Sequence, residues 1–193
     1  MIDNREQGTG NKYIELTTPL VDKDVEQLRV GDRVLLSGIV YTARDASQRH
    51  IVEDLEAGKE LPADLKGQVL YYTGPSPAGP GRVIGSAGPT TSARMDVYVR
   101  TMLELGVKGF IGKGRRSMDV RDDLKTYKAV YFLATAGAGA LLSRHITAAK
   151  VIGYPELGPE AVYELQLDRF PLIVGDDTYG DDMFEREWPR WKR

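Results

Sequence analysis

Short apolar runs that alternate with segments of helical spacing limit what this chain can fold into more than any other feature. Apolar, often β-branched runs between turn residues predict strands at residues 13–18, 33–41, 69–73, 82–86, 107–111, 129–134, 150–154 and 170–175. Helical spacing predicts helices at 45–57, 139–146 and 160–165, one between the turn at 88–91 and Gly106, and a single turn at 24–28. This alternation indicates an α/β fold, with a mixed sheet that is flanked by helices and is parallel in its later half.

The composition fits one globular domain. The chain has 193 residues, a hydrophobic fraction of 41%, a net charge of −2 and a mean hydropathy of −0.34. We expect a flexible N-terminal arm at 1–12, a single domain at 13–175 and a charged C-terminal tail at 176–193. Near-neutral charge argues against nucleic acid or a membrane as the main partner. With no run near the roughly 18 apolar residues of a membrane helix, and no apolar signal core at 1–12, we expect a cytoplasmic protein.

Metal and thiol chemistry on this chain is limited by its residue types. The sequence contains no cysteine and only two histidines, His50 and His145. This excludes a disulfide framework, a thiolate metal site and a cysteine nucleophile, and it argues against a histidine-rich metal site. Any metal chemistry must therefore use ligands from another chain.

The stretch GSAGPTTSARMD, residues 85–96, joins a predicted strand to a predicted helix. Its glycines allow a tight turn and the close approach of a ligand. Thr90 or Thr91 could cap the helix, whose first N–H groups favour an anion, and Arg94 follows Thr90 by four residues and could grip a carboxylate. The residues alone leave open that Thr90 is only a cap and Arg94 only a solvated helix residue.

Two further basic residues follow predicted strands. Arg44 lies in YTARD at the corner after residues 33–41, and Lys113 lies between two glycines after residues 107–111. The alternatives for Arg44 are a surface pair with Asp45 or a helix-capping contact. For Lys113 the alternative is an ordinary turn lysine in a charge cluster with the two arginines that follow it. If the strands are parallel neighbours, however, their ends share one edge, and two arginines and a lysine would converge there. That arrangement suits a substrate with two carboxylates.

Several motifs in order resemble the class I fumarate hydratase and L(+)-tartrate dehydratase family, specifically its C-terminal domain or separate β-subunit. They are LLSGIVYTARDAS, GPSPAGPGRVIGSAGPTTSARMD, GVKGFIGKG, YFLATAGAGALLS and YPELGPEAVYELQLDRFP, and together they cover most of the chain. One departure is Ala87, where many relatives of this family have cysteine.

The resemblance implies a swivelling β/β/α fold and the β-subunit of an iron–sulfur-dependent hydro-lyase that interconverts malate and fumarate. L(+)-tartrate dehydration to oxaloacetate is the alternative substrate choice. It implies that a partner α-subunit holds the [4Fe-4S] cluster, that Arg44, Arg94 and Lys113 bind the substrate carboxylates, and that Thr90 serves in proton transfer. An α2β2 assembly is expected, with self-association of the isolated chain as a further possibility.

Two other function classes compete with this interpretation. The basic residues after the strands would equally serve a non-enzymatic module that binds an anionic metabolite or scaffolds another protein. A stand-alone nucleotide-binding enzyme is the weakest hypothesis, because GPSPAGPG lacks the ending of a phosphate loop and GPGRVIG is not a dinucleotide fingerprint. The tail holds Trp188 and Trp191, which we expect to pack locally or to contact another subunit.

Overall fold

A computed structural model describes residues 13–191, and side chains up to Trp188. The expected arm at 1–12 lies outside the described residues. The strands are β1 (Ile14–Thr17), β2 (Arg33–Thr42), β3 (Val69–Tyr71), β4 (Gly109–Gly112), β5 (Val130–Leu133), β6 (Ile146–Gly153) and β7 (Val162–Asp176). The α-helices are α1 (Asp22–Glu26), α2 (Asp45–Glu56), α3 (Asp96–Glu104), α4 (Met118–Thr126), α5 (Gly139–Leu142) and α6 (Met183–Trp191). Three 3-10 helices are η2 (Ser92–Met95), η3 (Ser143–His145) and η4 (Pro155–Glu160).

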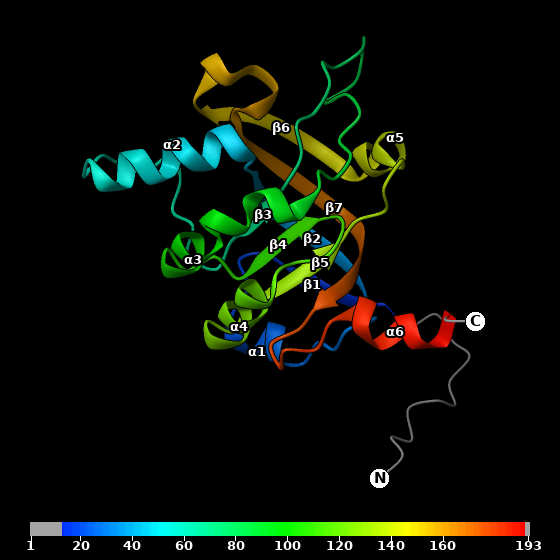
Figure 1. The fold of residues 1–193 in the computed structure, drawn as a ribbon. Coiled ribbons are helices and arrows are strands. Elements are labelled where there is room, and N and C mark those ends of the chain that lie inside the picture. Colours follow the sequence, from blue (N-terminus) through cyan, green and yellow to red (C-terminus); the bar gives the residue numbers. More distant parts are fainter. Residues whose placement is uncertain (1–12, 192–193) are drawn as a thin grey trace.

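The seven strands form one mixed sheet in the order β1-β2-β3-β4-β5-β7-β6 (Figure 1). The strands β1 to β5 are parallel to their neighbours, whereas β7 runs antiparallel to β2, β5 and β6. Because β7 also pairs with β2, the strands β2, β3, β4, β5 and β7 close into a small barrel. The expectation of a mixed sheet flanked by helices is confirmed. The expectation that its later half is parallel is wrong, since the short η4 connection between β6 and β7 can join only antiparallel neighbours.

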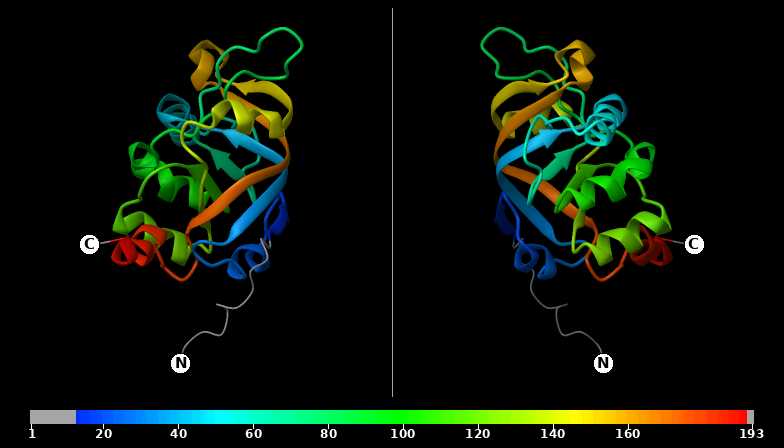
Figure 2. Two further views of the ribbon diagram at one scale, coloured as in Figure 1. Left: turned by 90° about the vertical axis from the view of Figure 1, so that its right-hand side faces the viewer. Right: turned by 90° about the vertical axis from the view of Figure 1, so that its left-hand side faces the viewer.

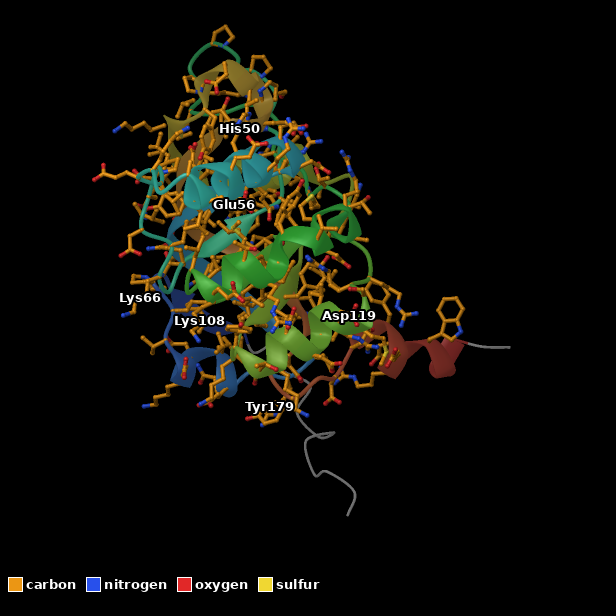
Figure 3. The ribbon with its side chains drawn as sticks, turned by 60° about the vertical axis from the view of Figure 1, so that its left-hand side comes forward. His50, Glu56, Lys66, Lys108, Asp119 and Tyr179 are labelled. Atoms are coloured by element: carbon orange, nitrogen blue, oxygen red, sulfur yellow. The ribbon has the colours of Figure 1, made fainter. Side chains whose placement is uncertain are left out.

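The helices α2, α3 and α4 lie one after another along one face of the barrel (Figures 1 and 2). Figure 3 shows the same face, with His50 marking α2 and Asp119 marking α4. The side chains of the strands alternate between two cores, as the period of two requires. In β5, Phe132 packs inside the barrel, and Tyr131 points to the helices and joins Met95 and Phe110 in the second core.

Two local predictions are wrong, and one helix was not predicted. Residues 160–165 were expected to form a helix, but from Val162 they belong to β7, where pairing with β2 and β6 outweighs local helical spacing. The expected strand at 82–86 is irregular, and α4 had not been expected at all. The charged tail contains α6, on which Trp188 is 68% exposed and lines a cavity together with Arg115, Phe184 and Glu185; the side chain of Trp191 lies outside the described part. No helix in the described residues is long and apolar enough to cross a bilayer.

Candidate functional site

The parallel strands β2, β3 and β4 end at a common edge of the barrel. Arg44 follows the last residues of β2, and Lys113 follows Gly112 at the end of β4. Between them, the segment 90–92 continues the sheet: the Thr90 N–H donates to the Tyr72 carbonyl over 2.7 Å, and the Ser92 N–H donates to the Lys113 carbonyl over 3.0 Å. We call this region, formed by residues 43–45, 72–74, 90–94 and 112–114, the carboxyl edge. All four residues singled out in the sequence lie on it.

Thr90 is held by its backbone from both sides. Its N–H is bound to Tyr72 after β3, and its carbonyl accepts from the Lys113 N–H over 3.2 Å. Among the described residues, no hydrogen bond involves the Thr90 hydroxyl, and the residue is half-buried. The main chain therefore fixes the position of Thr90 while its hydroxyl stays available for chemistry.

Arg44 bridges the ends of β2 and β3. A Cβ on Gly74 would lie 2.6 Å from the Arg44 Nη1, so the guanidinium packs directly against the glycine backbone. The Arg44 Nη2 lies 3.3 Å from the Glu160 carboxylate, which η4 supplies, and the Arg44 side chain is 21% exposed. Gly74 is thus the residue that gives the guanidinium its room.

Arg94 lies on η2 and reaches back to the start of α2. Its Nε donates to the Asp45 Oδ1 over 3.1 Å, and its Nη2 lies 2.9 Å from the Asp45 Oδ2. The sequence had suggested an Arg44–Asp45 surface pair as an alternative role of Arg44. That alternative is wrong, because Asp45 binds Arg94 and Arg44 binds Glu160. Asp45 thereby brings the loops of Arg44 and Arg94 together.

Lys113 is half-buried, and within the described residues its ammonium has no ion pair or hydrogen bond. The neighbouring arginines had suggested simple charge clustering, but their side chains pair with acidic residues away from Lys113. Arg115 pairs with Glu185 of α6 over 3.1 Å, and the Arg116 side chain is completely buried. Lys113 therefore stands apart from its basic neighbours.

The helix-capping part of the prediction is wrong. The residue before η2 is Thr91, whose side chain makes no capping bond, and Thr90 lies one residue further out. The first N–H of η2, on Ser92, already donates to Lys113. The Ser92 N–H is accordingly not free to bind a ligand on the carboxyl edge.

The carboxyl edge reaches the surface, since Thr90 and Lys113 are half-buried and the Arg94 side chain is 54% exposed. Cavities of about 720, 380, 290 and 330 Å³ in the described part of the chain are lined by residues outside this edge. The structure joins Arg44 to Arg94 through Asp45, and Thr90 to Lys113 through the backbone, but no described contact joins the first pair to the second. Their role in substrate binding stays a prediction.

Sequence patterns missed a buried polar layer beneath the edge. It consists of Ser92, Asp96, Arg116 and Tyr131, in which the Arg116 Nε lies 2.9 Å from the Asp96 Oδ1 and the Ser92 and Tyr131 hydroxyls are 2.8 Å apart. The only available signal was that Ser92 and Asp96 fall within the GSAGPTTSARMD stretch. No pattern marked the other two residues.

Metal ligands are scarce. The sequence has no cysteine, and the described residues contain no group of three or more histidine, aspartate or glutamate side chains able to hold a metal ion. Asp45 on the carboxyl edge and Glu160 beside it are both engaged by arginines. The edge is therefore suited to an anion and not to a cation.

Comparison with known proteins places this chain in a family. Residues 2–187 match the family described as Fumarase C-terminus. A Methanocaldococcus jannaschii protein with the provisional name L(+)-tartrate dehydratase subunit beta is 38% identical over 172 residues, which are 86% of this chain and 88% of the relative. The L(+)-tartrate dehydratase subunit beta of Escherichia coli is 33% identical over 173 residues, 87% of this chain and 85% of the relative.

Longer relatives match through one part of their length. The anaerobic class I fumarate hydratase of Escherichia coli is 33% identical over 187 residues, which are 94% of this chain but 34% of that enzyme. The chain thus spans about a third of the curated fumarate hydratases that it matches and nearly the full length of the subunits named beta. The chain belongs to the Fumarase C-terminus family.

Proposed function

We propose that this chain is the β-subunit of a hydro-lyase that reversibly eliminates water from a hydroxy-dicarboxylate, converting malate to fumarate, in a cytoplasmic complex with an iron–sulfur α-subunit. The observation that carries the proposal is the carboxyl edge. There Arg44, Arg94 and Lys113 follow successive parallel strands or lie between their ends, and Thr90 lies among them. The family membership and the names of the relatives support the same reaction class.

The three cationic side chains would bind the two carboxylates of the substrate in different ways. The planar guanidiniums of Arg44 and Arg94 suit bidentate hydrogen bonds to carboxylates, whereas the Lys113 ammonium acts as a point charge. In this structure, each arginine already holds one carboxylate of the chain through part of its fork. Asp45 and Glu160 thus orient the guanidiniums, and we assign accessible N–H groups outside these pairs to the substrate.

Thr90 would move the proton at carbon. A threonine hydroxyl is a weak base in water, so it needs nearby positive charge and a site closed to water to stabilise its alkoxide. We assign that charge to Lys113, whose main-chain N–H is bonded to the Thr90 carbonyl, so the two residues are neighbours on the carboxyl edge. An open edge does not exclude water, so the site must be closed by a second surface. Thr90 could also position a proton carrier that the α-subunit supplies.

The iron–sulfur cluster does not fit on this chain. Clusters are held by cysteine thiolates, the sequence has no cysteine, and the edge offers arginines and a lysine instead. The proposal therefore assigns the cluster to the α-subunit, and none of the steps given to Arg44, Thr90, Arg94 or Lys113 passes through it. The relatives named subunit beta support such a partner, and an α2β2 complex is the simplest symmetric assembly of two chain types.

L(+)-Tartrate is the second candidate substrate, with oxaloacetate as the product. The relatives whose length matches this chain are named L(+)-tartrate dehydratase subunit beta, and this favours it. Tartrate differs from malate by one hydroxyl, and a hydroxyl is discriminated by the group that binds it. The carboxyl edge holds the carboxylates of either substrate, so the choice falls to groups elsewhere in the complex.

The test is anaerobic co-expression with the α-subunit, followed by assays of the purified complex on malate, fumarate and both tartrate enantiomers. We expect activity in the complex and none in the isolated chain. Arg44→Lys should raise KM. Arg49→Lys is its matched control, because Arg49 is a 60% exposed residue of α2 whose ion pair within the described residues is with Glu53. A complex inactive on all these substrates, or an isolated chain that hydrates fumarate, would refute the proposal.

A further inference from the structure

One tyrosine hydroxyl joins two segments of the carboxyl edge from below. Tyr131 lies in β5, is 1% exposed, and donates a hydrogen bond to the Gly114 carbonyl over 3.0 Å. Its oxygen also lies 2.8 Å from the Ser92 hydroxyl. Because a phenol has one proton and Tyr131 gives it to Gly114, the Ser92 hydroxyl must be the donor in the second bond.

Both partners of Tyr131 belong to segments that carry proposed site residues. Ser92 lies between Thr90 and Arg94, and Gly114 follows Lys113 directly. The two segments also meet through their backbones, since the Ser92 N–H donates to the Lys113 carbonyl and the Lys113 N–H donates to the Thr90 carbonyl. The Tyr131 hydroxyl therefore adds a side-chain bond to a junction that otherwise consists of two main-chain bonds.

The tyrosine itself is held firmly. The Arg116 guanidinium lies 5.1 Å from the centre of the Tyr131 ring and 5.3 Å from that of Tyr72. Arg116 pairs with Asp96 over 2.9 Å, and the other Asp96 oxygen accepts from the Ser117 N–H over 3.0 Å. Burial raises the pKa of the Tyr131 phenol, so the hydroxyl keeps its proton at neutral pH.

Steric contacts in the same junction leave little freedom. A Cβ on Gly112 would overlap the Ser92 Oγ, so the Ser92 hydroxyl occupies the space beside the end of β4. Ser92 is 0% exposed. The buried Ser92 hydroxyl is therefore packed closely against the backbone that precedes Lys113.

We propose that Tyr131 is a positioning residue, whose hydroxyl fixes the segment of Thr90 and Arg94 against the loop of Lys113. The inference rests on the proposed function, in which Thr90 and Lys113 act together on one substrate. Tyr131 faces the helices beneath the edge and does not line it. Its effect on the reaction is therefore geometric, and a misplacement of about 1 Å can cost on the order of 100-fold in rate.

The kinetic test uses Tyr131→Phe in the full chain assembled with the α-subunit, with rates normalised to folded complex. We expect kcat to fall about 10- to 100-fold, and KM to stay within about 3-fold, because Asp45 and Glu160 still orient the two arginines. Ser92→Ala should reproduce the effect, and the double variant should be no slower than the slower single variant. A merely structural role would lower the yield of complex and leave kcat unchanged.

Tyr154→Phe is the matched control. The Tyr154 hydroxyl donates to the Asp54 Oδ2 over 2.9 Å near the far end of α2. The variant therefore also loses a tyrosine hydrogen bond, but one that lies away from Lys113. We expect its kcat to equal that of wild type. An equal loss of kcat in Tyr154→Phe, or no loss in Tyr131→Phe, would overturn the inference.

Hydrogen exchange tests the junction independently of activity. Tyr131→Phe should speed the exchange of the Ser92 and Lys113 amides, which cross the junction, and leave that of the Val34 amide in β2 unchanged. If the wild-type complex proves inactive on every substrate, the proposed function fails while this measurement still reports whether Tyr131 holds the segments together. Unchanged exchange at both junction amides would overturn the positioning role whatever the activity.

Discussion

The Arg94 guanidinium holds the Asp45 carboxylate through two nitrogens, with Nε 3.1 Å from Oδ1 and Nη2 2.9 Å from Oδ2. The two residues are 49 positions apart in the sequence. Asp45 directly follows Arg44, so this single ion pair links the end of β2 to the segment beyond β3. The spacing of the two arginines on the carboxyl edge depends on it.

Arg94→Lys should therefore weaken substrate binding. A lysine keeps the charge but loses the fork, and we expect kcat/KM to fall about 10- to 100-fold. Because the Arg94 side chain is 54% exposed, the free energy of unfolding should change by less than about 1 kcal/mol. Steady-state kinetics and urea unfolding measure the two effects.

Arg100→Lys is the matched control for that prediction. Arg100 lies on α3, is 68% exposed and also contacts two acidic side chains, Glu104 at 3.6 Å and Asp123 at 3.5 Å. It lies away from the carboxyl edge, so its kinetics should match wild type. Equal losses in the two variants would argue against a specific role for Arg94.

Thr90→Ala should impair the reaction without loosening the fold. The bonds from Thr90 to Tyr72 and Lys113 are main-chain bonds, which alanine keeps. We expect kcat to fall by about 100-fold or more, as for the loss of a proton-transfer group, with partial recovery in Thr90→Ser. Thr91→Ala removes an exposed hydroxyl one residue away and should be neutral. An unchanged kcat for Thr90→Ala would remove Thr90 from the chemistry.

Gly112→Ala should destabilise the chain. The added Cβ would overlap the Ser92 Oγ and lie 3.0 Å from the Tyr72 ring, and both side chains are fully buried. Overpacking of this kind costs about 1–3 kcal/mol, which urea unfolding can measure. Gly79→Ala is the control, because its Cβ would meet nothing within 4 Å, and it should lie within about 0.5 kcal/mol of wild type. A Gly112→Ala variant as stable as wild type would show that Ser92 can move aside.

The placement of Arg44 and Lys113 on the carboxyl edge was predictable, because each of them follows a strand. The strands that precede Arg44 and Lys113 are short apolar runs, and parallel packing carries their ends to one side. The ion pairs were not predictable. Local spacing does not indicate that the Asp45 carboxylate pairs with Arg94 and not with its neighbour Arg44.

The parts of the fold that were missed depend on tertiary contacts. The start of β7 has apolar residues at helical spacing, and only its pairing with β2 and β6 makes it a strand. Arg116 resembled a surface charge beside Arg115, because charge alone does not reveal burial. Its partner Asp96 lies on α3 and becomes a neighbour only through packing.

The last prediction concerns pH and the end of β7. Burial raises the pKa of Asp176 from 3.8 to about 7, and the nearby Asp182 carboxylate adds to the shift, while Arg116 and Arg121 oppose it. Asp176 is 2% exposed, and its Oδ2 has no hydrogen-bond partner in the described part of the chain. Asp176 is therefore a buried carboxyl that prefers to keep its proton.

The sign of the effect follows from the direction of the shift. Between pH 3.8 and about 7, the folded chain keeps a proton on Asp176 that the unfolded chain has lost. The contribution of Asp176 to the free energy of unfolding therefore falls as pH rises through this window and levels off above it. Asp176→Asn removes the titration. The free energy of unfolding of the variant, taken relative to that of wild type, should therefore rise by about 2–4 kcal/mol from pH 4 to pH 8. Asp181→Asn changes an exposed neighbour and is the control: its free energy of unfolding, measured by urea unfolding, should depend on pH as that of wild type does. The same pH dependence in Asp176→Asn as in wild type would contradict the assignment.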